Sequence, residues 1–222
     1  MRQYAIIVAG GTGQRFHSHI PKQFLLLKGL PILMHSIRAF YHFNSSIKIL
    51  ITLPANHFET WNALCKEHEF DIKHQKVIGG ETRFHSIKNA LDSIKGDDGF
   101  IAVHDAVRPL VNSELIKRGF ETAKQKGNAV PVIALYDSIR ELKGLRSIPV
   151  DRNSFVLVQT PQIFKISLLK EAYKQSYIPE FTDDAHVVEK AGTPVVLVEG
   201  SRGNIKITDK ADLLIAEALL NK

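Results

Sequence analysis

The chain alternates short, continuously apolar runs with longer segments of helical period. Runs without polar alternation are typical of strands that are covered by helices on both faces. Six of them have strand length: Tyr4–Val8, Ile47–Leu53, Phe100–His104, Ala129–Ala134, Phe155–Gln159 and Val195–Glu199. Amphipathic helices are predicted between and after them: Pro31–Phe43, His57–His68, Ser86–Ile94, Ser113–Lys126 and Asp209–Leu220, the last with Thr208 as N-cap. The alternation predicts an α/β fold with a Rossmann-like, doubly wound and mostly parallel sheet.

One segment does not fit this alternation. Residues 135–152, LYDSIRELKGLRSIPVDR, are too many for an ordinary connection and too charged for a core element. Lys143-Gly144 supplies a turn in the middle, which predicts a protruding β-hairpin arm within a single domain of residues 1–222. Because a two-stranded ribbon is marginally stable by itself in water, we expect the arm to pack on a second copy of the chain.

Composition fits a soluble globular protein. The chain has 222 residues, of which 44% are hydrophobic and 23% charged, and no apolar run approaches the length of a membrane span. The N-terminal apolar run leads directly into glycines and is interpreted as a first strand, not as a signal peptide. The single cysteine, Cys65, excludes an intrachain disulfide and fits a reducing compartment, so we expect the cytoplasm and no membrane association.

Net charge narrows the class of ligand. The formal charge is +6 and the sequence pI is about 9.3, which is compatible with nucleic-acid binding or with attraction of a small polyanion. Nucleic-acid binders gather Lys and Arg in a stripe, often between aromatic residues. Here the cations are scattered among carboxylates, without a basic run. The pattern favours a small-anion site and no nucleic-acid partner.

The first strand runs into AGGTGQRF and then PKQF. Gly10, Gly11 and Gly13 let backbone amides approach oxyanions closely. Arg15 offers a planar fork for bidentate phosphate contact, and Lys22 a compact charge. The spacing excludes a dinucleotide fingerprint, because that motif needs a small residue at the position of Phe16. It also excludes a Walker A loop, which closes with Gly-Lys-Ser/Thr. A phosphate-binding loop of another kind is indicated.

Further motifs follow in a fixed order. They are GGETRFHSI (79–87), HDAVRP (104–109), VDRN (150–153), TPQIF (160–164), FTDDA (181–185) and GNIKIT (203–208). Together with the glycine loop, they resemble the 2-C-methyl-D-erythritol 4-phosphate cytidylyltransferases over essentially the whole chain. The resemblance implies that CTP and a polyol phosphate condense to a CDP-alcohol and pyrophosphate, with a divalent cation, usually Mg²⁺. It also implies a homodimer whose arms are exchanged.

The resemblance assigns roles position by position. Arg15 and Lys22 would stabilise the pentacoordinate transition state at the α-phosphorus, while Arg152 and Ser138 would reach the substrate phosphate in the neighbouring subunit. Nucleotide contacts would come from Ala9, Gly10, Gly11, Gly13, Gly80, Glu81 and Ser86. Contacts to the ribose, the substrate hydroxyls and the polyol phosphate would come from Asp105, Ala106, Arg108, Thr160, Thr182 and Lys206. Asp105 is also the candidate magnesium ligand.

Two other functions remain open. A ribitol-5-phosphate cytidylyltransferase shares the first loop, HDxVRP and TPQ, and Val107 favours it because the methylerythritol family commonly has alanine there. VDRN, FTDDA and GNIKIT favour the methylerythritol enzyme instead. A noncatalytic CTP-binding module would not need the cations on the substrate side. Pyrophosphate release with each polyol phosphate separates the three.

Several conspicuous residues are interpreted as structural. His104 ends a buried strand and is predicted to be packed and hydrogen-bonded. Cys65 and Trp61 share the apolar face of one helix, which predicts packing for both. Asp183 and Asp184 are placed to begin a helix, where their charge favours the helix dipole.

Overall fold

The structure is a computed structural model that describes residues 1–11 and 20–220. Its strands are β1 (Gln3–Val8), β2 (Leu26–Leu27), β3 (Leu30–Pro31), β4 (Lys48–Leu53), β5 (Gln75–Ile78), β6 (Phe100–Asp105), β7 (Asn128–Ala134), β8 (Ile139–Lys143), β9 (Arg146–Val150), β10 (Val156–Val158), β11 (Gln162–Lys165) and β12 (Leu197–Glu199). Its α-helices are α1 (Ile32–Phe43), α2 (Phe58–Glu67), α3 (Arg83–Asp92), α4 (Ser113–Lys126), α5 (Ile166–Ala172), α6 (Asp184–Lys190) and α7 (Lys210–Leu219).

The central sheet of the described residues has eight strands. Seven follow the order β10-β7-β11-β6-β1-β4-β5, and β12 pairs with β7. The β6–β1–β4–β5 block is parallel throughout, whereas β11 and β10 run antiparallel to their neighbours. The predicted α/β fold with a mostly parallel sheet is confirmed, and all six predicted strands are present. The sequence pattern missed β5, in which two of the four residues are polar, and β11, which overlaps the TPQIF motif.

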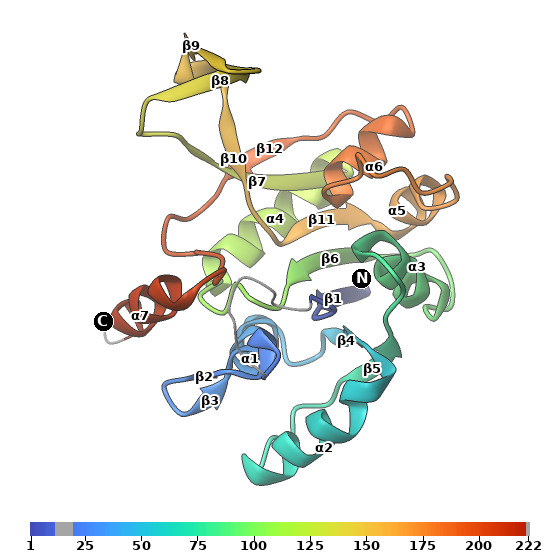
Figure 1. Cartoon of the computed structure of the whole chain (residues 1–222). Helices are drawn as coiled ribbons and strands as arrows, with labels where there is room; N and C mark the ends of the chain where they lie inside the picture. The colour runs from blue at the N-terminus through green and yellow to red at the C-terminus, as the bar shows by residue number, and fades with distance from the viewer. Residues whose placement is uncertain (12–19, 221–222) are drawn as a thin grey trace.

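Helices cover both faces of the sheet, as Figure 1 shows. Alternate side chains of β1 enter two separate cores. Ala5 and Ile7 pack with α1, α2 and α4, whereas Tyr4 and Ile6 pack with α3, α5 and α6. Trp61 is fully buried in the first core and Cys65 packs against it, so both are packing residues as predicted. Coverage on both faces explains why the strands read as continuous apolar runs.

The predicted hairpin arm is formed by β8 and β9. These strands pair from Ile139↔Val150 to Lys143↔Arg146 as a separate two-stranded sheet, and they project away from the body of the molecule (Figure 1). Gly144 turns the hairpin with φ 61°, a conformation that favours glycine. The side chains of Leu142 and Leu145 are almost fully exposed on it. The arm therefore presents apolar surface to solvent in the isolated chain.

Side-chain caps set several helix ends. Helix α4 has the predicted bounds because Asn112 accepts a hydrogen bond from the amide of Leu115 and Gly127 ends the helix at φ 93°. Asp183 caps α6, so the predicted helix start at FTDDA is confirmed. The predicted cap Thr208 is wrong. Asp209 caps α7 because its side chain and that of Asp212 form a reciprocal capping box.

Two strand ends position the site. Val8, the last residue of β1, pairs with Asp105, the last residue of β6, and the amide of Ala106 donates to the Val8 carbonyl at 3.0 Å. The glycine loop and HDAVRP therefore leave the same edge of the sheet side by side, where α/β proteins bind ligands. Among the described helices, none is long and apolar enough to cross a membrane.

Candidate active site

A cleft of about 380 Å³ lies at the carboxyl ends of β1 and β6. It brings together nine of the residues predicted for the site: Ala9, Gly10, Gly11, Lys22, Gly80, Glu81, Ser86, Asp105 and Lys206. Its lining also includes five residues for which no site role was predicted: Val8, Gln23, Thr82, Arg83 and Val107. Segments that are almost 200 residues apart in the chain thus converge on one cavity.

A larger cleft of about 860 Å³ lies near the amino ends of β1 and β4. Arg2, Lys48 and Lys73 are among its lining residues, but none of the predicted site residues is. Convergence of polar groups, rather than size, identifies a site for chemistry. We therefore assign the candidate active site to the smaller cleft.

The glycine loop enters the cleft along its backbone. The Gln23 side chain, which is buried, donates to the Ala9 carbonyl at 2.8 Å and ties the PKQF segment to the end of β1. The Lys22 ammonium lines the cleft and lies 3.3 Å from the Ile207 carbonyl oxygen. Two predicted residues, Gly13 and Arg15, lie outside the described residues.

The GGETRFHSI segment forms a tight loop before α3. The Gly80 amide donates to the Ser86 hydroxyl at 3.1 Å, and that hydroxyl donates to the Thr82 carbonyl at 3.0 Å. Thr82 also caps α3 by accepting from the amide of His85. Ser86 is buried and stabilises the loop through these bonds. The loop thus holds the backbone at Gly80 and Glu81 against the cleft.

Three cations surround the Asp105 carboxylate. The Lys206 Nζ lies 2.8 Å from Oδ2, the Arg108 Nε 3.8 Å from Oδ2, and the Arg83 Nε 3.6 Å from Oδ1. Burial alone would raise the pKa of Asp105, but the charges of Arg83, Lys206 and Arg108 outweigh it and hold that pKa well below its usual value. Asp105 is therefore ionised at neutral pH, within a group of excess positive charge.

Arg83 also contacts a second carboxylate. Its Nη2 donates to Asp184 Oδ2 at 2.6 Å, and Asp184 is fully buried. Burial alone would lower the pKa of Arg83, but Asp184 and Asp105 raise it above its ordinary value, so the guanidinium stays charged. Arg83 lies within the GGETRFHSI motif, but no site role was predicted for it. The signal available in the sequence was an unassigned cation within a motif whose other residues are predicted to contact nucleotide.

Buried polar side chains that do not line the cleft form hydrogen bonds next to Asp105 and with its backbone amide. The Asp105 amide donates to the Thr160 hydroxyl at 3.0 Å, and that hydroxyl lies 3.1 Å from His104 Nδ1. His104 Nε2 lies 3.1 Å from the Arg108 carbonyl, and the Arg108 Nη1 donates to the Asn204 carbonyl at 2.8 Å. Burial lowers the pKa of His104 to about 4, so the imidazole is neutral at pH 7. His104 is packed and hydrogen-bonded, as predicted.

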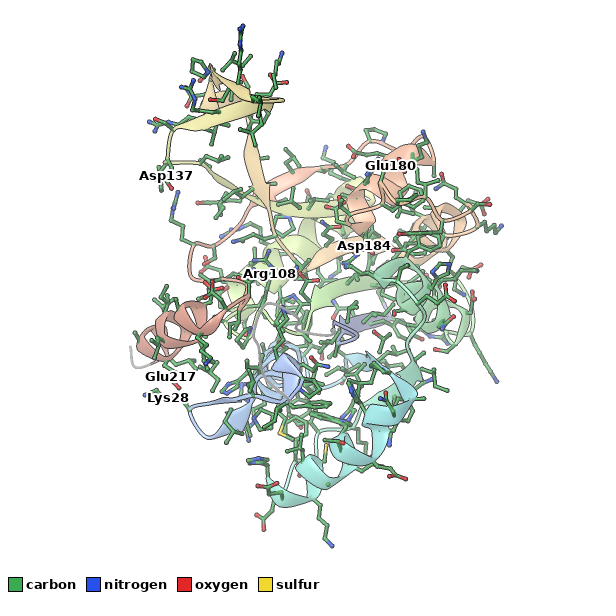
Figure 2. The ribbon with its side chains drawn as sticks, in the orientation of Figure 1. Lys28, Arg108, Asp137, Glu180, Asp184 and Glu217 are labelled. Carbon is green, nitrogen blue, oxygen red and sulfur yellow. The ribbon has the colours of Figure 1, made fainter. Side chains whose placement is uncertain are left out.

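The remaining predicted residues do not line the cleft. Ala106 is fully buried and Thr160 lies behind Asp105, while Thr182 is exposed before α6. Ser138 and Arg152 are exposed at the base of the arm, where the Arg152 guanidinium donates to the Tyr136 carbonyl. In Figure 2, Arg108 lies at the centre of the molecule and Asp137, next to Ser138, lies beside the arm. The isolated chain therefore separates the arm residues from the cleft.

The described residues contain no cluster of three or more histidine, cysteine or acidic side chains that would hold a metal ion by itself. The cleft lining has two carboxylates, Asp105 and Glu81. This donor set fits Mg²⁺, which is commonly held by one or two carboxylates together with substrate phosphates and water. It does not fit a metal that needs a complete protein cage.

A glycine-lined cleft with converging cations, at the carboxyl edge of a mostly parallel sheet, defines the class: a nucleotide-binding α/β protein. The family model for 2-C-methyl-D-erythritol 4-phosphate cytidylyltransferase matches residues 3–222. The chain therefore belongs to that family, whose members are nucleotidyltransferases.

Individual relatives agree with this assignment. The chain is 50% identical over 220 residues to a 2-C-methyl-D-erythritol 4-phosphate cytidylyltransferase of Bacteroides fragilis, covering 99% of this chain and 100% of the relative. The crystal structure of the enzyme of the same name from Thermus thermophilus is 32% identical, covers 100% of both chains and has a TM-score of 0.81. That from Francisella tularensis is 30% identical, covers 99% of this chain and 100% of the other, and also has a TM-score of 0.81.

Proposed function

We propose that the chain transfers the cytidylyl group of CTP to 2-C-methyl-D-erythritol 4-phosphate, forming 4-diphosphocytidyl-2-C-methyl-D-erythritol and pyrophosphate in isoprenoid precursor synthesis. The observation that carries the proposal is the convergence of the family's motif residues on one cleft. Backbone from the glycine loop and from Gly80-Glu81 meets the side chains of Lys22, Asp105 and Lys206 there. Membership of the family supports the same reaction.

The reaction needs positioning and charge neutralisation more than covalent participation by the protein. An oxygen of the polyol phosphate attacks the α-phosphorus of CTP, a new P–O bond forms, and the bond to the pyrophosphate breaks in line with it. Negative charge on the triphosphate oxygens must be stabilised as this happens. In the proposal Lys22 and Arg15 neutralise that charge, and the amides at Gly10, Gly11 and Gly13 contact the phosphates. Gly80, Glu81 and Ser86 would contact the cytosine and ribose of the nucleotide.

Asp105 and Lys206 are proposed to serve the acceptor. Asp105, with Ala106 and Arg108, would orient hydroxyl groups of the ribose and the polyol, for which a carboxylate that stays ionised is a good acceptor. Lys206 is half-exposed and pairs with Asp105 at 2.8 Å, so its ammonium is placed to exchange that contact for a substrate phosphate. Thr160 supports Asp105, and Thr182 would contact the acceptor from its other side.

A divalent cation, Mg²⁺ by preference, is proposed as the cofactor. Asp105 is the residue that would hold it, together with the triphosphate of CTP. The cation would supply neutralisation of phosphate charge beyond what the lysines and arginines provide.

Pyrophosphate release by the purified protein tests the function. The protein is incubated with CTP, Mg²⁺ and either 2-C-methyl-D-erythritol 4-phosphate or ribitol 5-phosphate, and parallel reactions contain ATP or EDTA. We expect release with CTP and the methylerythritol phosphate, and its loss in EDTA. Preference for ribitol 5-phosphate would establish the alternative enzyme, and CTP binding without release from either acceptor would indicate a binding module.

A homodimer with exchanged arms is proposed as the working assembly. It is supported by apolar side chains that are exposed on and beside the arm: Tyr136, Leu142, Leu145, Ile148, Phe155 and Leu157. Burying them on a second copy would bring Ser138 and Arg152 to the partner's acceptor phosphate. Sedimentation at micromolar concentration should give a dimer that L142E dissociates. L214E, the same substitution at an exposed leucine on α7, should leave the dimer intact. A monomeric wild-type protein would contradict the assembly.

We further propose that residues 1–222 act as one nucleotidyltransferase domain, with the arm at 135–152, and that the chain works in the cytoplasm. The two cores share β1, which supports a single folding unit. A single cooperative unfolding transition and recovery of the protein in the cytoplasmic fraction are the corresponding measurements.

A further inference from the structure

Arg83 lies between two carboxylates, of which only one belongs to the cleft. It begins α3, donates from Nη2 to Asp184 at 2.6 Å and lies 3.6 Å from Asp105 through Nε. We propose that Arg83 is a positioning residue for cytidylyl transfer, which holds the Asp105 carboxylate in place and uses Asp184 as its buried anchor. The inference rests on the proposed function and adds Arg83 and Asp184, neither of which was predicted as a site residue.

The anchor is fixed on both of its oxygens. Asp184 Oδ2 accepts from Arg83, and Oδ1 accepts from the Tyr173 hydroxyl at 2.6 Å. The Phe84 ring, next to Arg83, stacks on Tyr173 with centroids 4.6 Å apart and on Phe181 with centroids 5.6 Å apart. Figure 2 shows Asp184 at the inner side of α6, toward β11. Because both oxygens are used and the surroundings are packed, this carboxylate has little freedom to follow a moving partner.

Helix α6 is in turn attached to the strand beside Asp105. The buried Gln162 side chain on β11 donates to Asp183 at 2.8 Å and accepts from the amide of Ala185 at 2.8 Å. Strand β11 pairs with β6, which ends at Asp105. Asp184 and Asp105 are therefore held relative to each other by the Gln162 side-chain hydrogen bonds and the β11–β6 pairing. Arg83 contacts both carboxylates, Asp105 and Asp184. It thereby attaches the start of α3, and the Gly80–Glu81 loop before it, to the β6–β11–α6 unit.

The geometry requires an arginine. A guanidinium offers separate N–H groups in a planar fork, so one side chain can hold two carboxylates at once, whereas a lysine ammonium is a single point charge. Asp105 Oδ2 faces Lys206 and Arg108, and Arg83 is the cation recorded at Oδ1 among the described residues. Without Arg83, the orientation of the carboxylate would depend on the Lys206 and Arg108 contacts to Oδ2, and the proposed mechanism needs Lys206 for the acceptor phosphate.

Four variants test the proposal by steady-state pyrophosphate release and thermal unfolding. R83K keeps a positive charge near Asp184, R83M removes it, and R83M/D184N removes both charges so that no buried carboxylate is left unpaired. K88M is the matched control, because Lys88 lies on the same helix in an exposed ion pair with Asp92. We expect R83K and R83M/D184N each to lower kcat by at least about tenfold, as displaced catalytic groups do.

Stability separates positioning from a structural role. R83M should unfold at a lower temperature than wild type, and the added D184N should recover much of that loss without recovering kcat. K88M should keep kcat within twofold. Recovery of kcat together with stability in R83M/D184N, or wild-type kcat in R83K, would overturn the role of Arg83 while leaving the proposed function intact. A wild-type protein that is inactive with both acceptors would instead refute the proposed function, and this role with it.

Discussion

Replacing Gly80 by alanine gives a sharp test of the cleft geometry. A Cβ at this position would lie 2.9 Å from the backbone carbonyl carbon of His85 and closer still to its Cβ, whereas ordinary contact begins at 3.4 Å. Neither obstacle is the end of a flexible side chain, so the loop must move away from the start of α3 by about 1 Å. That loop carries Glu81 and Arg83 into the cleft and is closed by the Gly80–Ser86 hydrogen bond.

A displacement of about 1 Å in a positioning element costs on the order of 100-fold in rate. We therefore expect G80A to lower kcat/KM for CTP by about that factor, with a loss of about 1–3 kcal/mol in unfolding free energy from overpacking. G203A is the matched control, since its Cβ would lie 3.7 Å from Ser201 Oγ, an ordinary contact distance. Pyrophosphate release and urea unfolding measure both quantities. A G80A enzyme within threefold of wild type would refute the assignment of this loop to the nucleotide.

Three further predictions concern single residues. K22A should lower kcat by at least about 100-fold, the scale of losing one donor that stabilises the transition state, and a rise in KM alone would make Lys22 a ground-state binder. Burial lowers the pKa of His104 from 6.5 to about 4, so the imidazole takes up a proton more readily in the unfolded chain than in the folded one. The free energy of unfolding is therefore unaffected by this group above pH 6.5 and decreases as the pH falls from 6.5 toward 4. The loss is about 3 kcal/mol, and urea unfolding of H104N should lack that part of the pH dependence. D209A should cost about 1 kcal/mol of unfolding free energy through the lost α7 cap, whereas T208V should cost less.

The sequence predicted the elements whose own residues carry the signal. Helix α4 matched at both ends because Asn112 and Gly127 mark them chemically. The covered strands were found because burial on both faces makes them continuously apolar. Strand β11 was missed because it is short and begins with a glutamine, Gln162, whose side chain is buried and hydrogen-bonded to Asp183 and to the Ala185 amide at the start of α6. Thr208 was preferred to Asp209 because both are good caps, and only the chain's path selects between them.

The candidate site divides in the same way. The glycines and Lys22 were predicted from residue types close together in the chain that suit phosphate binding, and the HDAVRP residues from their resemblance to the family's motif. The sequence could not place Thr160 behind Asp105 instead of in the cleft, nor link Arg83 to Asp184, 101 residues away. Those relations depend on which strands pair and which helices pack together. The sequence by itself determined the chemistry that is available, and the tertiary structure decided which charges meet, because long-range packing sets the distances on which electrostatic pairing depends.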